Sequence, residues 1–409
     1  MPKMPKVIFN TLKLIAFRNH KKANFSFGNG VNLIVGPNGA GKTNILEAIN
    51  LLATGKSFRA RYDLEMIYNN ELASIVSLPR KDENSPLTPL NDKAFALDVH
   101  KKTPRSVFSL DSTQTDNDIV REFARVVGTI SNDKDGETLE VLIVKGNPNT
   151  NLSQKTFKVN GTPKPMYETA KYFSTVLFCP QDLDLFTGSP ALRRKFLDDL
   201  LCKVDQKYKK EHAIYSKAVR QRNRILEKIN KTRRGNDELP FWTTEILKTG
   251  TYLQEKRTEL IDTLNNNGTG NNIEQIYSDI SSQASKIRLE YKINQINLER
   301  LEKHREHEIY AKTTLVGPHR DDFDFLINNF SISHYGSRGQ QRTGVLALKI
   351  CELDIIDTKN SSSPVLLLDD IFSELDDVHR KALEGVVQKQ QTIITSTHAD
   401  IKAQNIITL

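Results

Sequence analysis

The residues best suited to chemistry lie in the segment LIVGPNGAGKTNILEAIN, residues 33–50. Its turn fits the pattern G-x-x-x-x-G-K-[ST], a glycine-rich loop whose backbone N–H groups surround phosphate oxygens. Lys42 is expected to contact the β- and γ-phosphates of ATP, and the Thr43 hydroxyl to bind Mg²⁺. An apolar strand precedes the loop and a helix follows it, so the positive helix end faces the phosphates. The residues predicted to bind ATP are Gly36, Pro37, Asn38, Gly39, Ala40, Gly41, Lys42 and Thr43.

Two acidic residues follow an apolar run near the other end of the chain, in PVLLLDDIFSELD at residues 364–376. A P-loop ATPase needs a carboxylate for Mg²⁺ and a group that positions the attacking water. We therefore expect Asp369 to hold Mg²⁺, through water, and Asp370 to orient or activate the water. An acidic turn at the protein surface is the alternative interpretation.

A third stretch, YGSRGQQRTGVLALKICELDII, begins at Tyr335 and resembles the signature motif of ABC-type ATPases. Small residues followed by a helix N-terminus form a suitable anion site. The resemblance implies that Ser337, Gly339 and Gln340 cap the γ-phosphate of ATP bound to the other subunit of a dimer. An ordinary helix cap is the alternative. By the same resemblance, Ser373–Asp376 is the D-loop that crosses the dimer interface.

Two further residues are candidates for the ATP site. His398 ends the apolar run TIITSTH, where ABC-type ATPases place a catalytic switch histidine near the γ-phosphate. Gln181, in LFCPQDLDLF, is a candidate for the Q-loop glutamine that senses nucleotide and Mg²⁺. A structural histidine and an ordinary loop glutamine remain the alternatives.

The pattern along the chain predicts an α/β protein in three parts. Residues 1–190 should form the N-terminal lobe of an ATPase head, with paired strands over 7–35, a β-hairpin within 121–160 and a polar excursion at 79–118. The pattern of residues 191–306 predicts long helices joined by polar loops, which indicates an inserted helical arm domain. Residues 307–409 should form the C-terminal lobe. The ABC-type head is therefore assembled from both chain ends.

Composition limits the class of protein. The 409 residues are 38% hydrophobic and carry a net charge of +8, which suits a core-forming protein with a polyanionic partner. The three cysteines have no metal-like spacing, and no apolar run approaches the roughly 20 residues of a membrane span. The start lacks a cleavable signal pattern. We expect a soluble cytoplasmic protein.

The positive charge is concentrated in residues 203–234, which hold 12 lysines and arginines against three acidic residues. A basic stripe beside an apolar seam can follow a phosphate backbone, although most charge runs are solvated helix faces. Since no base-reading motif is present, we expect binding of double- and single-stranded DNA with little sequence specificity. The candidate DNA contacts are Lys203, Lys210, Lys217, Arg224 and Lys231, which recur every seventh position, and Arg220.

Taken together, the motifs above and the blocks GKSFR, PQDLDLFTGSPALRRKFLD, GPHRDD and GQQRT resemble the RecF family of SMC-related ATPases. The blocks extend from about residue 7 to residue 400. The resemblance implies a weak, DNA-dependent ATPase that dimerises with ATP and binds double-stranded and gapped DNA. It also implies loading of recombinase with RecO and RecR. The alternatives are the nucleotide-binding subunit of an ABC transporter, and a repair nuclease with an added metal-binding carboxylate cluster.

Overall fold

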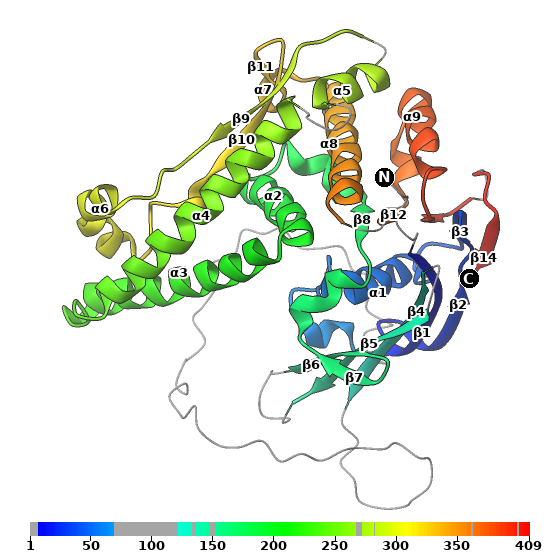
Figure 1. Ribbon diagram of the computed structural model, residues 1–409, viewed down its shortest axis with the longest axis horizontal. Coiled ribbons are helices and arrows are strands. Elements are labelled where there is room, and N and C mark those ends of the chain that lie inside the picture. The colour runs from blue at the N-terminus through cyan, green and yellow to red at the C-terminus, as the bar shows by residue number, and fades with distance from the viewer. Residues whose placement is uncertain are drawn as a thin grey trace, which may run out of the picture.

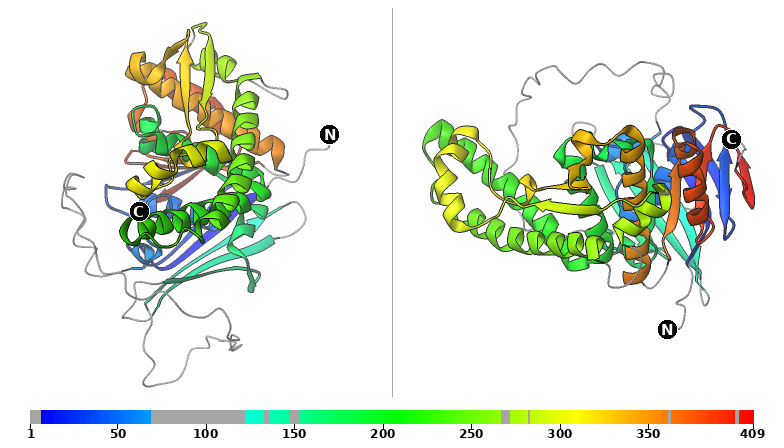
Figure 2. Two further views of the ribbon diagram at one scale, coloured as in Figure 1. Left: turned by 90° about the vertical axis from the view of Figure 1, so that its left-hand side faces the viewer. Right: turned by 90° about the horizontal axis from the view of Figure 1, so that it is seen from above.

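A computed structural model describes residues 7–68, 122–132, 136–146, 153–266, 272–281, 283–360, 363–398 and 401–409. The chain forms a head of two stacked sheets, from which a helical arm projects to one side (Figures 1 and 2). The expected excursion at 79–118 lies outside the described residues. In the described part of the chain, every helix is too short or too polar to cross a lipid bilayer.

The central sheet of the head is parallel and has the strand order β14-β3-β13-β12-β8. Its strands come from both chain ends: β3 (Val31–Val35), β8 (Thr175–Phe178), β12 (Val365–Asp369), β13 (Thr392–Ser396) and β14 (Asn405–Thr408). In β12, Leu366 and Leu368 face one hydrophobic core while Val365 and Leu367 face the other. A parallel strand that is buried on both faces has a continuous apolar sequence, as observed here.

A second, antiparallel sheet has the order β2-β1-β4-β5-β6-β7. Its strands are β1 (Ile8–Phe17), β2 (His20–Ser26), β4 (Phe123–Ser131), β5 (Gly136–Lys145), β6 (Ser153–Val159) and β7 (Thr162–Lys164). Helix α1 (Lys42–Thr54) lies between the two sheets, and its apolar side chains join both in one core. The β5–β6 pairing confirms the expected hairpin, whereas β3 leaves the paired strands of 7–35 and joins the parallel sheet.

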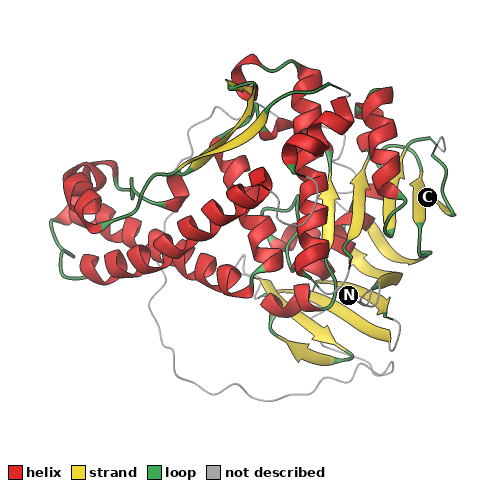
Figure 3. Ribbon diagram, turned by 45° about the horizontal axis from the view of Figure 1, so that its top comes forward, coloured by secondary structure: helices red, strands yellow, loops and turns green. Residues whose placement is uncertain are grey.

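The other face of the parallel sheet is covered by helices, as Figure 3 shows in red beside the yellow strands. These are α8 (Arg338–Lys359) and α9 (Asp377–Val387), and α2 (Pro190–Val204), α5 (Ile273–Ser281) and α7 (Ile332–Tyr335) pack against α8. They share a core with β8 and β12 that continues into the base of the arm. The head is thus an ordered stack of antiparallel sheet, α1, parallel sheet and covering helices.

The arm consists of α3 (Gln206–Thr232), α4 (Leu239–Asn266) and α6 (Leu298–Ala311). Of the residues expected to form its apolar seam, Tyr208, Tyr215, Ala218, Ile225 and Ile229 are buried on α3. Val204, also expected there, is half-buried at the end of α2. The prediction of helix throughout this region is wrong at β9 (Ile287–Lys292). This strand pairs with β10 (Asp322–Ile327), which in turn pairs with β11 (Phe330–Ser331). Ile287 and Leu289 alternate inward on β9, so the strand period is present in the sequence but short.

Candidate nucleotide-binding site

The phosphate-binding loop lies between the carboxyl end of β3 and the first turn of α1. Gly41 adopts φ 101°, a left-handed conformation that residues with a side chain rarely adopt. A Cβ at this position would also lie 2.6 Å from side-chain atoms of Asn19 and His20. The Lys42 ammonium is buried over the loop and donates to the carbonyl oxygens of Gly36, at 2.7 Å, and Pro37, at 3.0 Å. The loop therefore has the backbone that the motif requires.

The two halves of the predicted metal site are in contact although they are far apart in the sequence. The Thr43 hydroxyl donates to Asp369 Oδ1 at 2.8 Å, and the Thr395 hydroxyl donates to the same oxygen at 2.9 Å. Asp369 follows Val365 and Leu367 in alternation, so its side chain lies on the α1 face of β12. Hydroxyl and carboxylate oxygens suit Mg²⁺, which usually takes few protein ligands. The described residues contain no group of three or more histidine, cysteine or acidic side chains that could hold a metal by themselves.

Asp370 has an unusual backbone conformation at the carboxyl end of β12. Its φ is 50° and its ψ is 25°, in the left-handed region that a residue with a side chain adopts only at a cost. The Asp370 N–H donates to the Thr395 carbonyl at 3.2 Å and hydroxyl at 3.0 Å, and the Asp370 carbonyl accepts from Ser373. Backbone strain held by several bonds is typical of functional positions. The carboxylate directly follows Asp369, where we expect a group that acts on water.

Burial of Asp369 leads to a testable effect on stability. Desolvation raises the pKa of Asp369, although bonds from Thr43 and Thr395 oppose the shift. A carboxyl whose pKa is higher in the folded state lowers stability as pH rises through that range. At neutral pH, Asp369→Asn should therefore raise the melting temperature of the nucleotide-free protein by a few degrees and remove its further stabilisation by Mg²⁺-ATP. Thermal unfolding with and without nucleotide measures both.

Asp377→Asn, at the exposed start of α9, is the control for that experiment and should change neither quantity. A lower melting temperature for nucleotide-free Asp369→Asn would contradict the expectation. It would mean that the bonds from Thr43 and Thr395 outweigh the cost of burying the charge.

Gln181 and His398 lie after strands of the same sheet. Gln181 is exposed in the 3₁₀ turn Pro180–Leu185 after β8, and His398 is exposed two residues after β13. Both strands run parallel to β12, so both residues follow strand ends at the edge where the loop and Asp369 lie. Ligands of open α/β sheets bind at this carboxyl edge. Their roles as Mg²⁺ sensor and catalytic switch stay predictions.

The signature residues form the start of α8. Ser337 is the N-cap: its hydroxyl accepts from the Gln340 N–H at 3.2 Å, and its own N–H donates to Gln340 Oε1 at 2.8 Å. Ser337, Gly339 and Gln340 are all exposed. Helix α7, which immediately precedes Ser337, lies at the top of Figure 1, whereas α1 lies in the lower half. The signature is therefore remote from the phosphate loop of its own chain.

Three residues beside the loop were not predicted. Asn19 donates to the Gly39 carbonyl at 3.3 Å and accepts from Asn44, and the His20 Nε2 lies 3.3 Å from the Gly41 carbonyl. Burial lowers the pKa of His20, which favours the neutral ring. Arg59 donates to Asn44 at 3.0 Å. These residues lie in the basic turn RNHKK and the block GKSFR, but no sequence pattern links them to the loop, because the contacts are tertiary.

The basic residues of the arm divide into two groups. Lys210, Lys217, Arg220 and Arg224 are exposed along α3, and Lys231 is exposed but paired with Glu227 at 2.7 Å. Lys203 is not part of this stripe. It lies on α2, which ends before Asp205, and its ammonium pairs at 2.7 Å with the buried Glu352 of α8. The seven-residue period therefore breaks at Asp205, which caps the start of α3.

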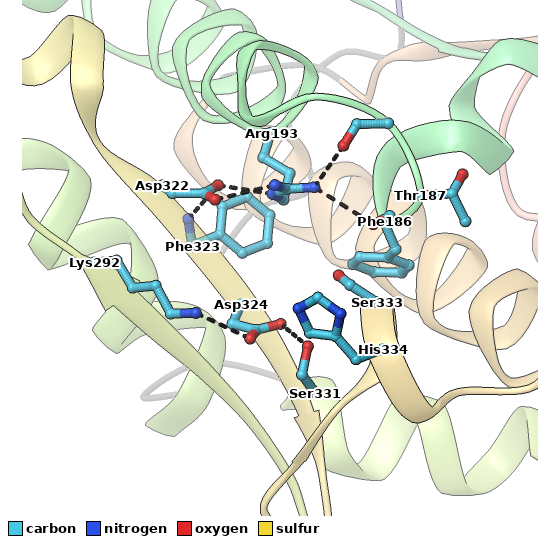
Figure 4. A pocket seen from close by; sticks show the side chains of 11 residues that line it. Phe186, Thr187, Arg193, Lys292, Asp322, Phe323, Asp324, Ser331, Ser333 and His334 are labelled. Carbon is cyan, nitrogen blue, oxygen red and sulfur yellow. Dashed lines mark hydrogen bonds and ion pairs between the residues drawn. The ribbon is translucent and has the colours of Figure 1, made fainter.

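A cavity of about 340 Å³ lies between α2, β10 and α7, near the signature (Figure 4). Its main charged groups pair with one another. Arg193 binds both oxygens of Asp322, at 2.7 and 3.0 Å, and Lys292 donates to Asp324 at 3.1 Å. The first pair joins the start of α2 to β10 and the second joins β9 to β10, so both have a structural role.

A phosphate loop, a second carboxylate brought from the other chain end and a remote signature helix define an ABC-type P-loop ATPase head that carries a helical arm. The family model described as RecF/RecN/SMC N terminal domain matches residues 8–406. The chain belongs to the RecF family.

Individual relatives align with this chain along nearly their whole length. The DNA replication and repair protein RecF of Agathobacter rectalis is 33% identical, covering 98% of this chain and 94% of the relative. RecF of Bacillus thuringiensis strain Al Hakam is 30% identical, with 96% and 93% covered. Two solved structures, of the recombination mediator protein RecF-ATPrS and RecF-ATP in the RecFOR pathway, match with TM-scores of 0.78 and 0.77. They are 27% and 28% identical, cover all of this chain, and are themselves covered to 98% and 96%.

Proposed function

We propose that this chain is an ATP-dependent DNA-binding protein of replication and recombinational repair. ATP with Mg²⁺ closes a homodimer, and the dimer binds double-stranded DNA next to single-strand gaps. There it acts with RecO and RecR to load recombinase. Weak, DNA-dependent hydrolysis then reopens the dimer, so the ATPase works as a conformational switch. The relatives named as DNA replication and repair proteins, and those solved with nucleotide in the RecFOR pathway, support this proposal.

The observation that carries the proposal is the position of the signature. Ser337 caps an exposed helix start, while Thr43 and Asp369 meet elsewhere in the same chain. One chain therefore supplies a phosphate loop without a signature beside it, and a signature without a loop beside it. Two chains related by a twofold axis can complete both sites, because an isologous interface uses each surface twice. ATP then lies between the subunits.

Each residue has a separate task in such a site. The loop N–H groups and Lys42 hold the phosphates, and Ser337 and the N-terminus of α8 approach the γ-phosphate from the other subunit. Thr43 and Asp369 would hold Mg²⁺, which when bound neutralises charge that develops on the phosphate oxygens. Asp370 orients the attacking water and accepts its proton, and His398 donates a hydrogen bond toward the γ-phosphate. Gln181 follows β8, the strand next to β12, and senses bound nucleotide and Mg²⁺.

The base of the arm supports a DNA path toward the ATPase. Burial lowers the pKa of Lys209 on α3; Cys202 opposes this shift and the positive charge of Lys56 adds to it. Lys56 follows α1, and Lys210 and Lys217 continue outward on α3. A surface with positive charge raises the local concentration of polyanions. Duplex DNA is a polyanion of suitable length for this surface.

Charge reversal on α3 tests the DNA function. Replacing Lys210, Lys217 and Arg224 by Glu should weaken ATP-dependent binding to duplex DNA of any sequence by at least tenfold. Each lost phosphate contact should also reduce the slope of log K against log salt by about 0.9. Fluorescence anisotropy with labelled duplexes, over a salt series with ATP and with ADP, measures both. ATP binding without DNA should be unchanged.

The matched control reverses three exposed lysines elsewhere, Lys303, Lys359 and Lys389, with the same change in net charge. It should retain most of the affinity. Equal losses of DNA affinity in the two triple variants would mean that the basic residues of α3 do not contact DNA and form only a solvated helix face. Equal binding of the wild-type protein with ATP and with ADP would contradict the proposed switch.

A further inference from the structure

The helix that begins with the signature packs on the parallel sheet through its apolar face, and one buried lysine adds a hydrogen bond to the edge strand. Lys349 lies on α8, twelve residues after Ser337, or about 18 Å along the helix. Its ammonium donates to the Leu177 carbonyl of β8 at 2.9 Å and lies 3.3 Å from Asp182 Oδ1. It also lies 3.4 Å from Glu352 Oε2 on its own helix. The side chain is only 12% exposed.

The Leu177 carbonyl accepts a hydrogen bond from the ammonium, and the two carboxylates are its ion-pair partners. Strand β8 is an edge of the five-stranded sheet, and Asp182 belongs to the 3₁₀ turn that carries Gln181. Glu352 is shared with Lys203 of α2, so two cations and two carboxylates form a compact cluster. In this cluster, Lys349 is the residue that connects α8 to β8 and to the turn after it.

Strand β8 and the 3₁₀ turn after it are also held by interactions that do not involve Lys349. Four residues of β8 pair with β12, and the Cys179 N–H caps the 3₁₀ turn by donating to Asp182 at 2.9 Å. The start of α8 is exposed and depends on how the rest of the helix is held. Loss of the lysine should therefore shift α8 along the sheet edge more than it disturbs the Gln181 turn, while the buried face of α8 keeps the helix packed.

We propose that Lys349 is a positioning residue for the nucleotide site of the partner subunit. It holds α8 at a set position on the sheet edge, and α8 presents Ser337 to ATP bound in the other chain. Lys349 also pairs with Asp182, in the same turn as Gln181. In the proposed dimer it thereby joins the Gln181 turn, which serves the nucleotide bound by its own chain, to the signature, which serves the nucleotide bound by the partner chain. This inference rests on the shared site of the proposed function and names a residue that couples its two copies.

Mixed dimers separate this role from general stability. A chain with Ser337→Arg can provide only a phosphate loop, and a chain with Asp370→Asn can provide only a signature. Their mixture has one working composite site per heterodimer. Lys349→Met placed on the signature-providing chain should lower kcat of the mixture at least tenfold, since small misplacement of a positioned group costs up to about 100-fold. Placed on the loop-providing chain, the same change should leave kcat within about twofold.

The parent mixture, without any change at Lys349, tests the underlying proposal first. If that mixture is inactive, the shared site fails and the role of Lys349 fails with it. If it is active and Lys349→Met has the same effect on either chain, the shared site stands and the positioning role is wrong. Binding of ATP by each separate variant should stay at the wild-type affinity, which confirms that the chains are folded.

Two further variants serve as a control for the cluster and as an independent test of the contact between Lys349 and Asp182. Lys203→Met removes the other cation of Glu352 but no bond to β8, so its effect should be small and independent of the chain that carries it. Asp182→Asn keeps an acceptor for the Cys179 N–H and removes only the charge that faces Lys349. On the signature-providing chain it should lower kcat in the same direction as Lys349→Met. A full rate from this variant would overturn the link.

Discussion

Mixing two inactive variants, Ser337→Arg and Asp370→Asn, should restore ATP hydrolysis. We expect each variant alone to fail, because the first puts bulk and charge at the proposed position of the partner's nucleotide and the second lacks the carboxylate proposed to act on water. A heterodimer combines the intact Asp370 of one chain with the intact Ser337 of the other. Random pairing would make half of the dimers heterodimers with one working site of two, so about a quarter of the wild-type rate is the upper limit, because stable Asp370→Asn homodimers compete for chains. Phosphate release at equal concentrations measures it.

The control mixture combines Asp370→Asn with Lys42→Ala. Both changes damage the loop side of the site, so no pairing of these chains yields a complete site, and the mixture should stay inactive. Light scattering provides the second measurement. Asp370→Asn should form a stable dimer with ATP, and Ser337→Arg should remain monomeric. A Ser337→Arg chain that dimerises with ATP and hydrolyses it normally would reduce the signature to an ordinary helix cap.

The largest effect on stability is expected from Arg257→Met. The Arg257 guanidinium is buried between Asp198 of α2, with contacts of 2.8 to 3.0 Å, and Asp321, at 3.1 Å, and it donates to the Pro318 carbonyl at 2.7 Å. Its removal leaves two buried carboxylates without their main cation. Breaking a buried ion pair in this way costs about 3–5 kcal/mol. Urea unfolding at neutral pH should show this loss.

Lys256→Met, one residue earlier on α4, is the matched control. Its exposed pair with Glu259 should contribute less than about 1 kcal/mol. A loss below 1 kcal/mol for Arg257→Met would mean that water or neighbouring groups replace the guanidinium. In that case the network would not be what joins the arm to the head.

The ion pairs of Arg257 with Asp198 and Asp321 also predict how the free energy of unfolding changes at low pH. Burial alone would raise the pKa of Asp198, but Arg257, His212 and Tyr208 together lower it to about 2. A carboxyl with a lowered pKa in the folded state contributes stability above its unfolded value of 3.8, and this contribution is lost as pH falls toward 2. The difference in unfolding free energy between wild type and Arg257→Met should therefore shrink over that range.

Much of the nucleotide site could be predicted from the sequence because its parts are local patterns. The loop from Gly36 to Thr43, the apolar strand ending at Asp369 and the helix start at Ser337 each combine a backbone requirement with a neighbouring element. Such patterns hold wherever the segment lies in the fold. The α/β class and the assembly of the head from both chain ends followed from their order along the chain.

Other features depend on contacts between distant segments, which a local pattern does not encode. The strand β9 forms because β10 offers a pairing edge, although the helical sequence around it predicts otherwise. Lys203 leaves the basic stripe because Asp205 ends one helix and starts the next, and because Glu352 is buried nearby. Asn19 and His20 reach the loop only through the stacking of the antiparallel sheet on α1. Arg59, in the segment after α1, bonds to Asn44 in the first turn of that helix.

The sequence by itself determined which residues are candidates to bind phosphate, hold a metal and act on water, since these abilities belong to residue types and to the short-range backbone geometry around them. The tertiary structure alone decided which of them meet. It brought Thr43 to Asp369 across the parallel sheet, kept Ser337 away from its own loop, and buried Lys349 at the sheet edge. The physical reason is that burial and long-range pairing depend on how whole layers pack, whereas turns and caps depend on a few neighbouring residues.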